Sequence, residues 1–144
     1  MNAEPPEKAA ILIKQATLLA DKIANPLLAP YNLTPSQYKV IKFLYNHPPA
    51  TVRQIDIEQH FELRNPTVTG ILQNLEKNGW ILRVPNPDDA RSKVLSASKK
   101  ALELQGELNG IGSKIESGLT KNLTDTEHNE LIVLLKKILA DDGE

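Results

Sequence analysis

Hydrophobic positions recur with helical spacing along most of the chain, and one segment combines such a stripe with a polar outer face. Over residues 65–78 the apolar side chains stand at positions i, i+3, i+4 and i+7, which places them on one side of a helix: Val68, Ile71, Leu72 and Leu75. Asn65 fits the N-cap and Pro66 the first helical position, where the missing N–H costs nothing. The pattern predicts a helix with one face on a core and the other free for a partner.

The outer face of this helix is polar and contains a glycine. It carries no large apolar group, and its members are Thr69, Gly70, Gln73 and Lys77. Gly70 is an unusual choice there, because a glycine inside a helix costs on the order of 1 kcal/mol relative to alanine. Close approach of the helix backbone to the major groove of DNA would explain it. An ordinary solvated face is the alternative.

The residues after this helix predict a β-hairpin. Asn78 and Gly79 are typical of a helix C-terminus, and the aromatic and branched residues 80–84 indicate a strand. Turn-forming residues fill 85–90, and 91–96 returns as a second short strand. A helix followed by such a hairpin is typical of a winged helix.

A shorter helix is predicted immediately upstream. Thr51 is a candidate cap for a helix that extends to Phe61, and Ile57 and Phe61 would face inward. Residues 62–64 would form the turn into the helix at Asn65. Two helices joined by such a turn form a helix-turn-helix, whose second helix enters the major groove.

Longer helices are predicted towards both ends of the chain. Residues 8–28 and 35–46 follow helical spacing, the second of them behind a Thr-Pro start. Residues 97–118 are predicted to be a helix that is bent, broken or very closely packed, because its four glycines lower helix propensity. The last helix begins at the capping box 124–127 and has a strong apolar face.

These elements predict a mainly α-helical fold with a small β-hairpin wing. We assign residues 33–96 to a winged helix-turn-helix DNA-binding region, and 1–32 with 97–144 to a helical dimerisation region. The amphipathic stripes at both chain ends need a partner, which a second copy would supply. At 144 residues, the chain is expected to be one domain by size.

Several segments together resemble a known family. They are Leu33–Tyr38, the run 65–79 followed by Trp80-Ile81, the triplet Asp89-Ala90-Arg91, and Leu123-Thr124 before the last helix. In this order and spacing, over about residues 30 to 140, the chain resembles the multiple antibiotic resistance regulator (MarR) family. Glu62 departs from the pattern, since many helix-turn-helix turns carry glycine there. The resemblance implies regulation by a phenolic or other amphipathic molecule bound between the dimerisation helices and the reading helix.

The predicted DNA contacts on the helix lie along its outer face and at its start. The side chains predicted to face base edges are Thr67, Thr69, Gly70, Gln73 and Asn74. Gln73 is able to pair bidentately with adenine. Arg64 would lie at the helix entry, and the helix N-terminus around Asn65 and Pro66 would favour phosphate.

The wing supplies the remaining predicted contacts. Arg91 and Lys93 flank the hairpin tip and would contact phosphates or the minor groove. The alternative is a charged hairpin that protects its edge from pairing with other strands.

Composition narrows the function classes. The net charge of −1 argues against a histone-like binder, so that DNA binding must come from local charge. Residues 51–100 hold eight Lys and Arg against six Asp and Glu, which is a small excess. The chain has no cysteine, which excludes a disulfide framework, a thiolate nucleophile and a cysteine redox switch.

Other chemistry is also disfavoured. His47, His60 and His128 lack the spacing of a metal site, and neither a phosphate-binding loop nor a nucleophile elbow indicates an enzyme. No apolar run exceeds about five residues, so we expect no membrane span or signal segment and a cytoplasmic protein.

We therefore expect a sequence-specific DNA-binding transcriptional regulator without cofactor or metal. It would act as a homodimeric, ligand-released repressor on a pseudo-palindromic site with half-sites about one helical turn apart. The alternative is a winged-helix protein-interaction module without DNA binding. A small-molecule pocket lined by aromatic residues is a further hypothesis, with plain core positions as its alternative: Tyr31, Tyr38, Tyr45 and Trp80.

Overall fold

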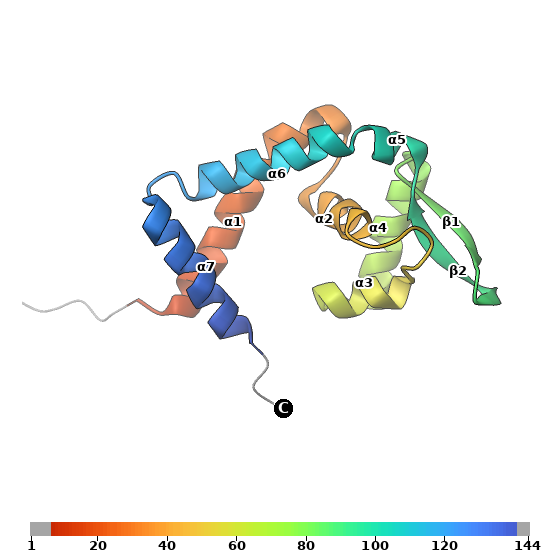
Figure 1. Ribbon diagram of the computed structural model, residues 1–144, viewed down its shortest axis with the longest axis horizontal. Coiled ribbons are helices and arrows are strands. Elements are labelled where there is room, and N and C mark those ends of the chain that lie inside the picture. The colour runs from red at the N-terminus through yellow and green to blue at the C-terminus, as the bar shows by residue number, and fades with distance from the viewer. Residues whose placement is uncertain (1–6, 141–144) are drawn as a thin grey trace, which may run out of the picture. The chain divides into compact units, whose positions relative to one another are not determined.

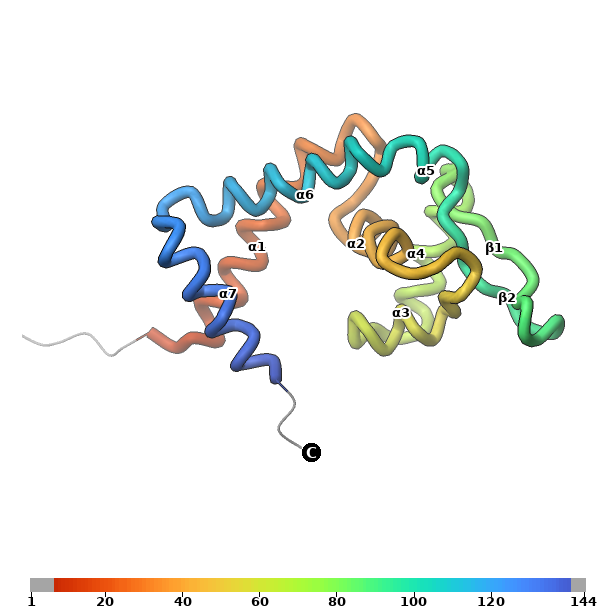
Figure 2. Tube along the Cα trace, in the orientation of Figure 1, coloured from red at the N-terminus to blue at the C-terminus, as the bar shows by residue number. Residues whose placement is uncertain are grey.

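The computed structural model describes residues 7–140 and divides them into two compact units (Figures 1 and 2). One unit is Ala24–Gly112, and the other combines the described residues up to Ile23 with those from Ser113 onward. Helices α1 (Ala9–Leu28) and α6 (Gln105–Leu119) contribute residues to both. None of the helices in the described part of the chain is both long and apolar enough to cross a membrane.

The unit Ala24–Gly112 is a winged helix. After the end of α1 its elements are η1 (Ala29–Tyr31), α2 (Pro35–Tyr45), α3 (Gln54–Phe61), α4 (Asn65–Lys77), β1 (Ile81–Asn86), β2 (Asp89–Ala97), α5 (Lys99–Glu103) and the first part of α6. Helix α4 packs against α2, α3 and β1, and β1 pairs with β2 in an antiparallel hairpin (Figure 1). The predicted fold class, mainly helical with a hairpin wing, is confirmed.

Helix α3 begins later than predicted. Thr51 does not cap it, since its hydroxyl donates to the Pro48 carbonyl at 2.7 Å. The next residue, Val52, is extended and pairs with Leu95 of β2, whose N–H donates to the Val52 carbonyl at 2.7 Å. The helix therefore starts only after this bridge, with Arg53 as N-cap.

The turn between α3 and α4 lies where it was predicted. Glu62 ends α3 in the left-handed region, with a φ of 53°. The N–H of Leu63 donates to the Glu58 carbonyl at 3.0 Å, which satisfies a carbonyl of the last turn. Glu62 thus adopts the conformation for which glycine is the usual residue.

Helix α4 has the predicted core face, but its start differs by one residue. Val68, Leu72 and Leu75 are fully buried. Asn65 is the first helical residue and Arg64 is the N-cap, so the prediction of Asn65 as N-cap is wrong. The Asn65 amide donates to the Glu58 carboxylate at 2.8 Å instead of serving the α4 backbone.

The wing is longer than predicted. Its strands run to Asn86 and from Asp89, which leaves Pro87 and Asp88 as the turn. The Asn86 side chain organises this turn, because its Oδ1 accepts from the Asp88 N–H at 2.9 Å and its Nδ2 donates to Ser92 Oγ at 3.1 Å. The register shifts between Pro85 and Asn86, so the pairing continues past the proline.

The glycine-containing segment is interrupted at Leu104, between α5 and α6, rather than at a glycine. At this point the Tyr45 hydroxyl donates to the Ala101 carbonyl, which a continuous helix would use for its own ladder. Close packing accounts for one of the glycines, because a Cβ on Gly112 would lie 2.9 Å from the Tyr38 hydroxyl.

In the second unit, α7 (Asp125–Leu139) begins at the predicted capping box, in which the Thr124 hydroxyl accepts from the Glu127 N–H at 3.1 Å. A Cβ on Gly118 of α6 would lie 3.3 Å from Ile23 of α1, so these helices are in close contact there. No residue of α7 is buried. The first six and last four residues of the predicted dimerisation region lie outside the described residues.

Candidate nucleic-acid interface

The outer face of α4 is open. Opposite the buried stripe, the side chains with high exposure are Pro66, Thr67, Gln73, Asn74 and Lys77. None of them is a large apolar residue. Four of the predicted base-facing positions therefore share one accessible side of the helix: Thr67, Gly70, Gln73 and Asn74.

Gly70 occupies open space on this face. A Cβ built at Gly70 would meet no atom of the described chain within 4 Å. Internal packing therefore gives no reason for a glycine at this helical position. A requirement from outside the chain, such as a close-fitting groove, is consistent with this geometry.

Thr69 and Asn65 lie to the side of this face and are engaged by α3. The hydroxyl of Thr69 accepts a hydrogen bond of 2.9 Å from the Gln54 amide, and the Asn65 amide donates to Glu58. The structure thus separates Thr69 and Asn65 from the four base-facing positions on the open side of α4. Gln54 and Glu58 were not among the predicted site residues, although their spacing of one helical turn on α3 was a signal in the sequence.

The start of α3 carries a charged pair that was also missed. The Arg53 guanidinium donates to the Asp56 carboxylate at 3.0 Å, and Asp56 also accepts from the Arg53 backbone N–H at 2.8 Å. The hydrogen-bonded guanidinium holds the pKa of the Asp56 carboxyl below its usual 3.8. An acid three residues after the N-cap was the signal in the sequence.

The basic groups of the wing differ in their exposure. Arg91 has 93% of its side chain exposed and lies 3.3 Å from Asp89, and Lys93 is exposed as well. Arg83, by contrast, is half-buried and pairs with Glu76 of α4 at 2.5 Å. Arg91 and Lys93 are therefore available at the surface, whereas Arg83 fastens the hairpin to α4.

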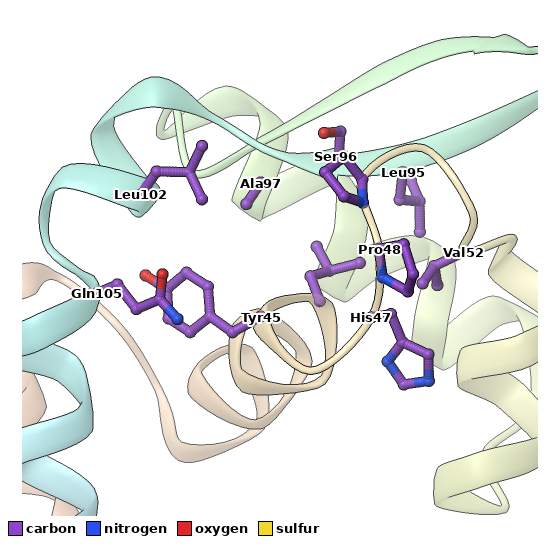
Figure 3. A pocket seen from close by; sticks show the side chains of 11 residues that line it. Tyr45, His47, Pro48, Val52, Leu95, Ser96, Ala97, Leu102 and Gln105 are labelled. Carbon is purple, nitrogen blue, oxygen red and sulfur yellow. The ribbon is translucent and has the colours of Figure 1, made fainter.

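A cavity of about 160 Å³ lies between the end of α2, the loop after it, β2 and α5 (Figure 3). Its apolar walls include Val52, Leu95 and Leu102, and Tyr45 lines it as well. The other predicted pocket aromatics do not line it. Tyr31 donates to Glu107, Tyr38 donates to the Leu108 carbonyl, and Trp80 is buried in the core.

The histidines do not form a metal site. His47 and His60 stack against Phe43, with ring centroids 4.1 and 4.7 Å away, whereas His128 contacts Glu116 at 2.5 Å. Within residues 7–140, no group of three or more His, Asp or Glu side chains could hold a metal ion.

The sequence is similar to known regulators. The MarR family model matches residues 33–93. The chain is 30% identical over 131 residues to the multiple antibiotic resistance protein MarR of Escherichia coli, covering 89% of this chain and 88% of that protein. It is also 30% identical over 105 residues to the HTH-type transcriptional regulator BilQ of Clostridioides difficile, covering 73% of this chain and 70% of that protein.

The fold is similar to solved structures of the same kind. The crystal structure of a mutant E. coli MarR complexed with operator DNA has a TM-score of 0.80 and 27% identity, covering 91% of this chain and 93% of that one. BilQ is a transcriptional regulator and the E. coli MarR mutant binds operator DNA, which agrees with the DNA-binding regulator predicted from the sequence. The chain therefore belongs to the MarR family of winged-helix, DNA-binding transcriptional regulators.

Proposed function

We propose that this regulator is a homodimeric repressor that reads a pseudo-palindromic operator with the outer face of α4. The observation that carries the proposal is the polar, accessible outer face of α4 with open space at Gly70. A solvated helix has no need of a glycine at this position, whereas a helix lying against the edges of base pairs gains from a missing side chain.

Gln73 is the principal reading residue, and Thr67 and Asn74 support it. A glutamine pairs bidentately with adenine in the major groove and discriminates by about 1–3 kcal/mol against a wrong base. Arg64 and the α4 N-terminus at Asn65 and Pro66 contact phosphate. From the wing, Arg91 and Lys93 contact phosphates or the minor groove, and these contacts position the helix without specifying sequence.

The dimer forms through the helices at the two chain ends. Large apolar side chains of α1 and α7 are exposed in the single chain, among them Leu18 at 57%, Leu134 at 56% and Ile138 at 61%. An exposed apolar surface of this kind is typical of a protein–protein interface, and a second copy related by a two-fold axis would cover it. Two such copies imply half-sites about one helical turn apart, on the order of 34 Å.

A small amphipathic or phenolic molecule releases the repressor. A candidate location within Ala24–Gly112 is the cavity beside Tyr45, whose size of about 160 Å³ suits a single aromatic ring. His47, Ser96 and Gln105 supply polar groups at its wall. A molecule seated there would contact both α2 and β2. We infer that the protein acts in the cytoplasm, where bacterial operators are accessible.

The test is selection of DNA by the purified protein from a random pool, combined with sedimentation of the complex. We expect an enriched site with two-fold symmetry, a dimer mass, and binding that weakens steeply with salt because counterions are released. Enrichment of a site without symmetry, or a monomer on DNA, would contradict the proposal. Absence of salt-sensitive binding would favour a protein-interaction module.

A further inference from the structure

Two polar residues of α3 face two polar residues of α4. Gln54 and Glu58 are one turn apart on α3, and Asn65 and Thr69 are one turn apart on α4. The Gln54 amide donates to Thr69 Oγ1 at 2.9 Å and to Glu58 Oε2 at 3.2 Å. Glu58 Oε2 also accepts from the Asn65 amide at 2.8 Å. We call these four residues the α3–α4 network.

The network joins the helices in a defined register. Ile57 of α3 and Val68 and Leu72 of α4 are fully buried, and the hydrophobic contribution of such contacts is not directional. Directional bonds at both ends of the shared face oppose such movements. Rotation of α4 about its axis would break the directional bond from Gln54 to Thr69 as well as shift the apolar contacts.

Glu58 places a negative charge beside the start of α4. Within residues 7–140 no cationic side chain forms an ion pair with it, and its partners are the two neutral amides. It lies beside the first turn of α4, where the helix dipole favours a negative charge. A DNA phosphate would favour the same position. Glu58 therefore weakens general DNA attraction there while it holds Asn65.

We propose that Gln54 and Glu58 are positioning residues that determine which α4 side chains read bases. They hold Thr69 and Asn65 against α3 and thereby set the rotation of α4 that presents Thr67 and Gln73 to the groove. This inference rests on the proposed base reading by α4. It assigns Thr69 an indirect role, acting through Gln54, in place of the direct base contact that the sequence suggested.

A double-mutant cycle tests the link between Gln54 and Thr69. Thr69→Val keeps the shape and removes the hydroxyl, and Gln54→Met keeps the length and removes the donor. Each change is expected to lower the ratio of cognate to scrambled DNA affinity by roughly threefold to tenfold, and the double variant by no more than the larger single effect. Additive effects would overturn the inference, because they would mean that Thr69 contacts bases by itself.

Thr67→Val is the matched control for this cycle. It makes the same chemical change about half a turn around the helix from Thr69, on an exposed side chain. The effects of Thr67→Val and Gln54→Met on the affinity ratio should be additive. If Thr67→Val is coupled to Gln54→Met as strongly as Thr69→Val is, the link between Gln54 and Thr69 is not specific. Circular dichroism and sedimentation check that the variants keep the wild-type fold and assembly.

Glu58→Gln provides a second test that leaves Gln54 in place. We expect tighter binding of both DNAs, because a negative charge near phosphate is removed, together with a reduced ratio of cognate to scrambled affinity. Glu62→Gln removes one charge from the adjacent turn and should tighten binding without changing that ratio. Equal ratios for both variants would overturn the positioning role. A wild-type protein without base discrimination would instead refute the proposed function.

Discussion

The Tyr38 hydroxyl on α2 donates a hydrogen bond of 2.6 Å to the Leu108 carbonyl of α6. Tyr45, two turns further along α2, makes the equivalent bond to Ala101 of α5. The two bonds run in antiparallel register and fasten α2 to both sides of the break at Leu104. Burial raises the pKa of both phenols, and that of Tyr45 reaches about 12.

The raised pKa of Tyr45 predicts a loss of stability in alkali. The folded state keeps the phenolic proton at pH values where the unfolded chain has released it. The contribution of Tyr45 to the free energy of unfolding is therefore fully present below the usual pKa of 10.0. This contribution is lost as the pH rises through about 12. Urea unfolding measured at several alkaline pH values should show a falling free energy of unfolding over this window.

Tyr45→Phe separates this titration from other alkaline effects. The variant should be less stable at neutral pH by about 1 kcal/mol, because the Ala101 carbonyl loses its phenolic donor. Its free energy of unfolding should then fall less steeply than that of the wild type above pH 10.0, the usual tyrosine value. An alkaline slope equal to that of the wild type would mean that other groups cause the loss.

Gly70→Ala should stabilise the protein and weaken its DNA binding. The added methyl group meets nothing within 4 Å in the described chain, so we expect a gain of up to about 1 kcal/mol from helix propensity. The same methyl group would obstruct close approach to the major groove. Thermal unfolding and binding titrations on one preparation measure both effects.

Gly106→Ala in α6 is the matched control for that variant. A Cβ there also meets nothing within 4 Å, but Gly106 lies outside the proposed DNA surface. It should raise stability and leave DNA affinity unchanged. If Gly70→Ala binds DNA as tightly as Gly106→Ala, then the α4 backbone does not approach the groove closely.

Local patterns predicted most of the elements, and contacts distant in the sequence account for the late start of α3 and accompany the break at Leu104. The stripe of α4 was visible because Val68, Leu72 and Leu75 repeat with the helical period. By contrast, α3 starts late because Val52 pairs with Leu95, which no local pattern reveals. The tyrosine bond that accompanies the break at Leu104 also joins residues far apart in the chain.

The candidate site, too, was only partly predictable from local sequence patterns. The outer face of α4 was predictable from polarity alone, and Gln73 and Gly70 lie on it as expected. The hydrogen bonds that hold Thr69 and Asn65 to α3 were not predictable in this way, because they depend on how the two helices face each other. A helical period defines a face, but neighbours across the turn decide which polar groups remain available.

Charge on the apolar face of α7 should weaken assembly. Leu134→Lys puts an ammonium group on a surface that we propose to be buried between two copies, where an unpaired charge is costly. We expect a lower sedimentation mass and weaker DNA binding, since one half-site then binds alone. Asn129→Lys adds the same charge at an exposed polar position of α7 and should keep the assembly. If Leu134→Lys keeps the same sedimentation mass as Asn129→Lys and the wild type, Leu134 does not lie in the interface.

Substitutions of Gln73 and Arg91 should affect DNA binding differently, because we propose that Gln73 reads a base and Arg91 contacts phosphate. Gln73→Ala should lose discrimination at one base position of each half-site, by roughly 1–3 kcal/mol if its bond is bidentate, with a smaller loss on scrambled DNA. Arg91→Ala should weaken cognate and scrambled DNA evenly and reduce the salt dependence by about one phosphate per protomer. Titrations of each variant across salt on both duplexes distinguish the two roles. If Gln73→Ala matches the wild type on both duplexes, Gln73 does not read bases. If Asn74→Ala matches the wild type as well, the outer face of α4 does not read bases, because these two exposed amides are the side chains on that face that can pair bidentately with adenine.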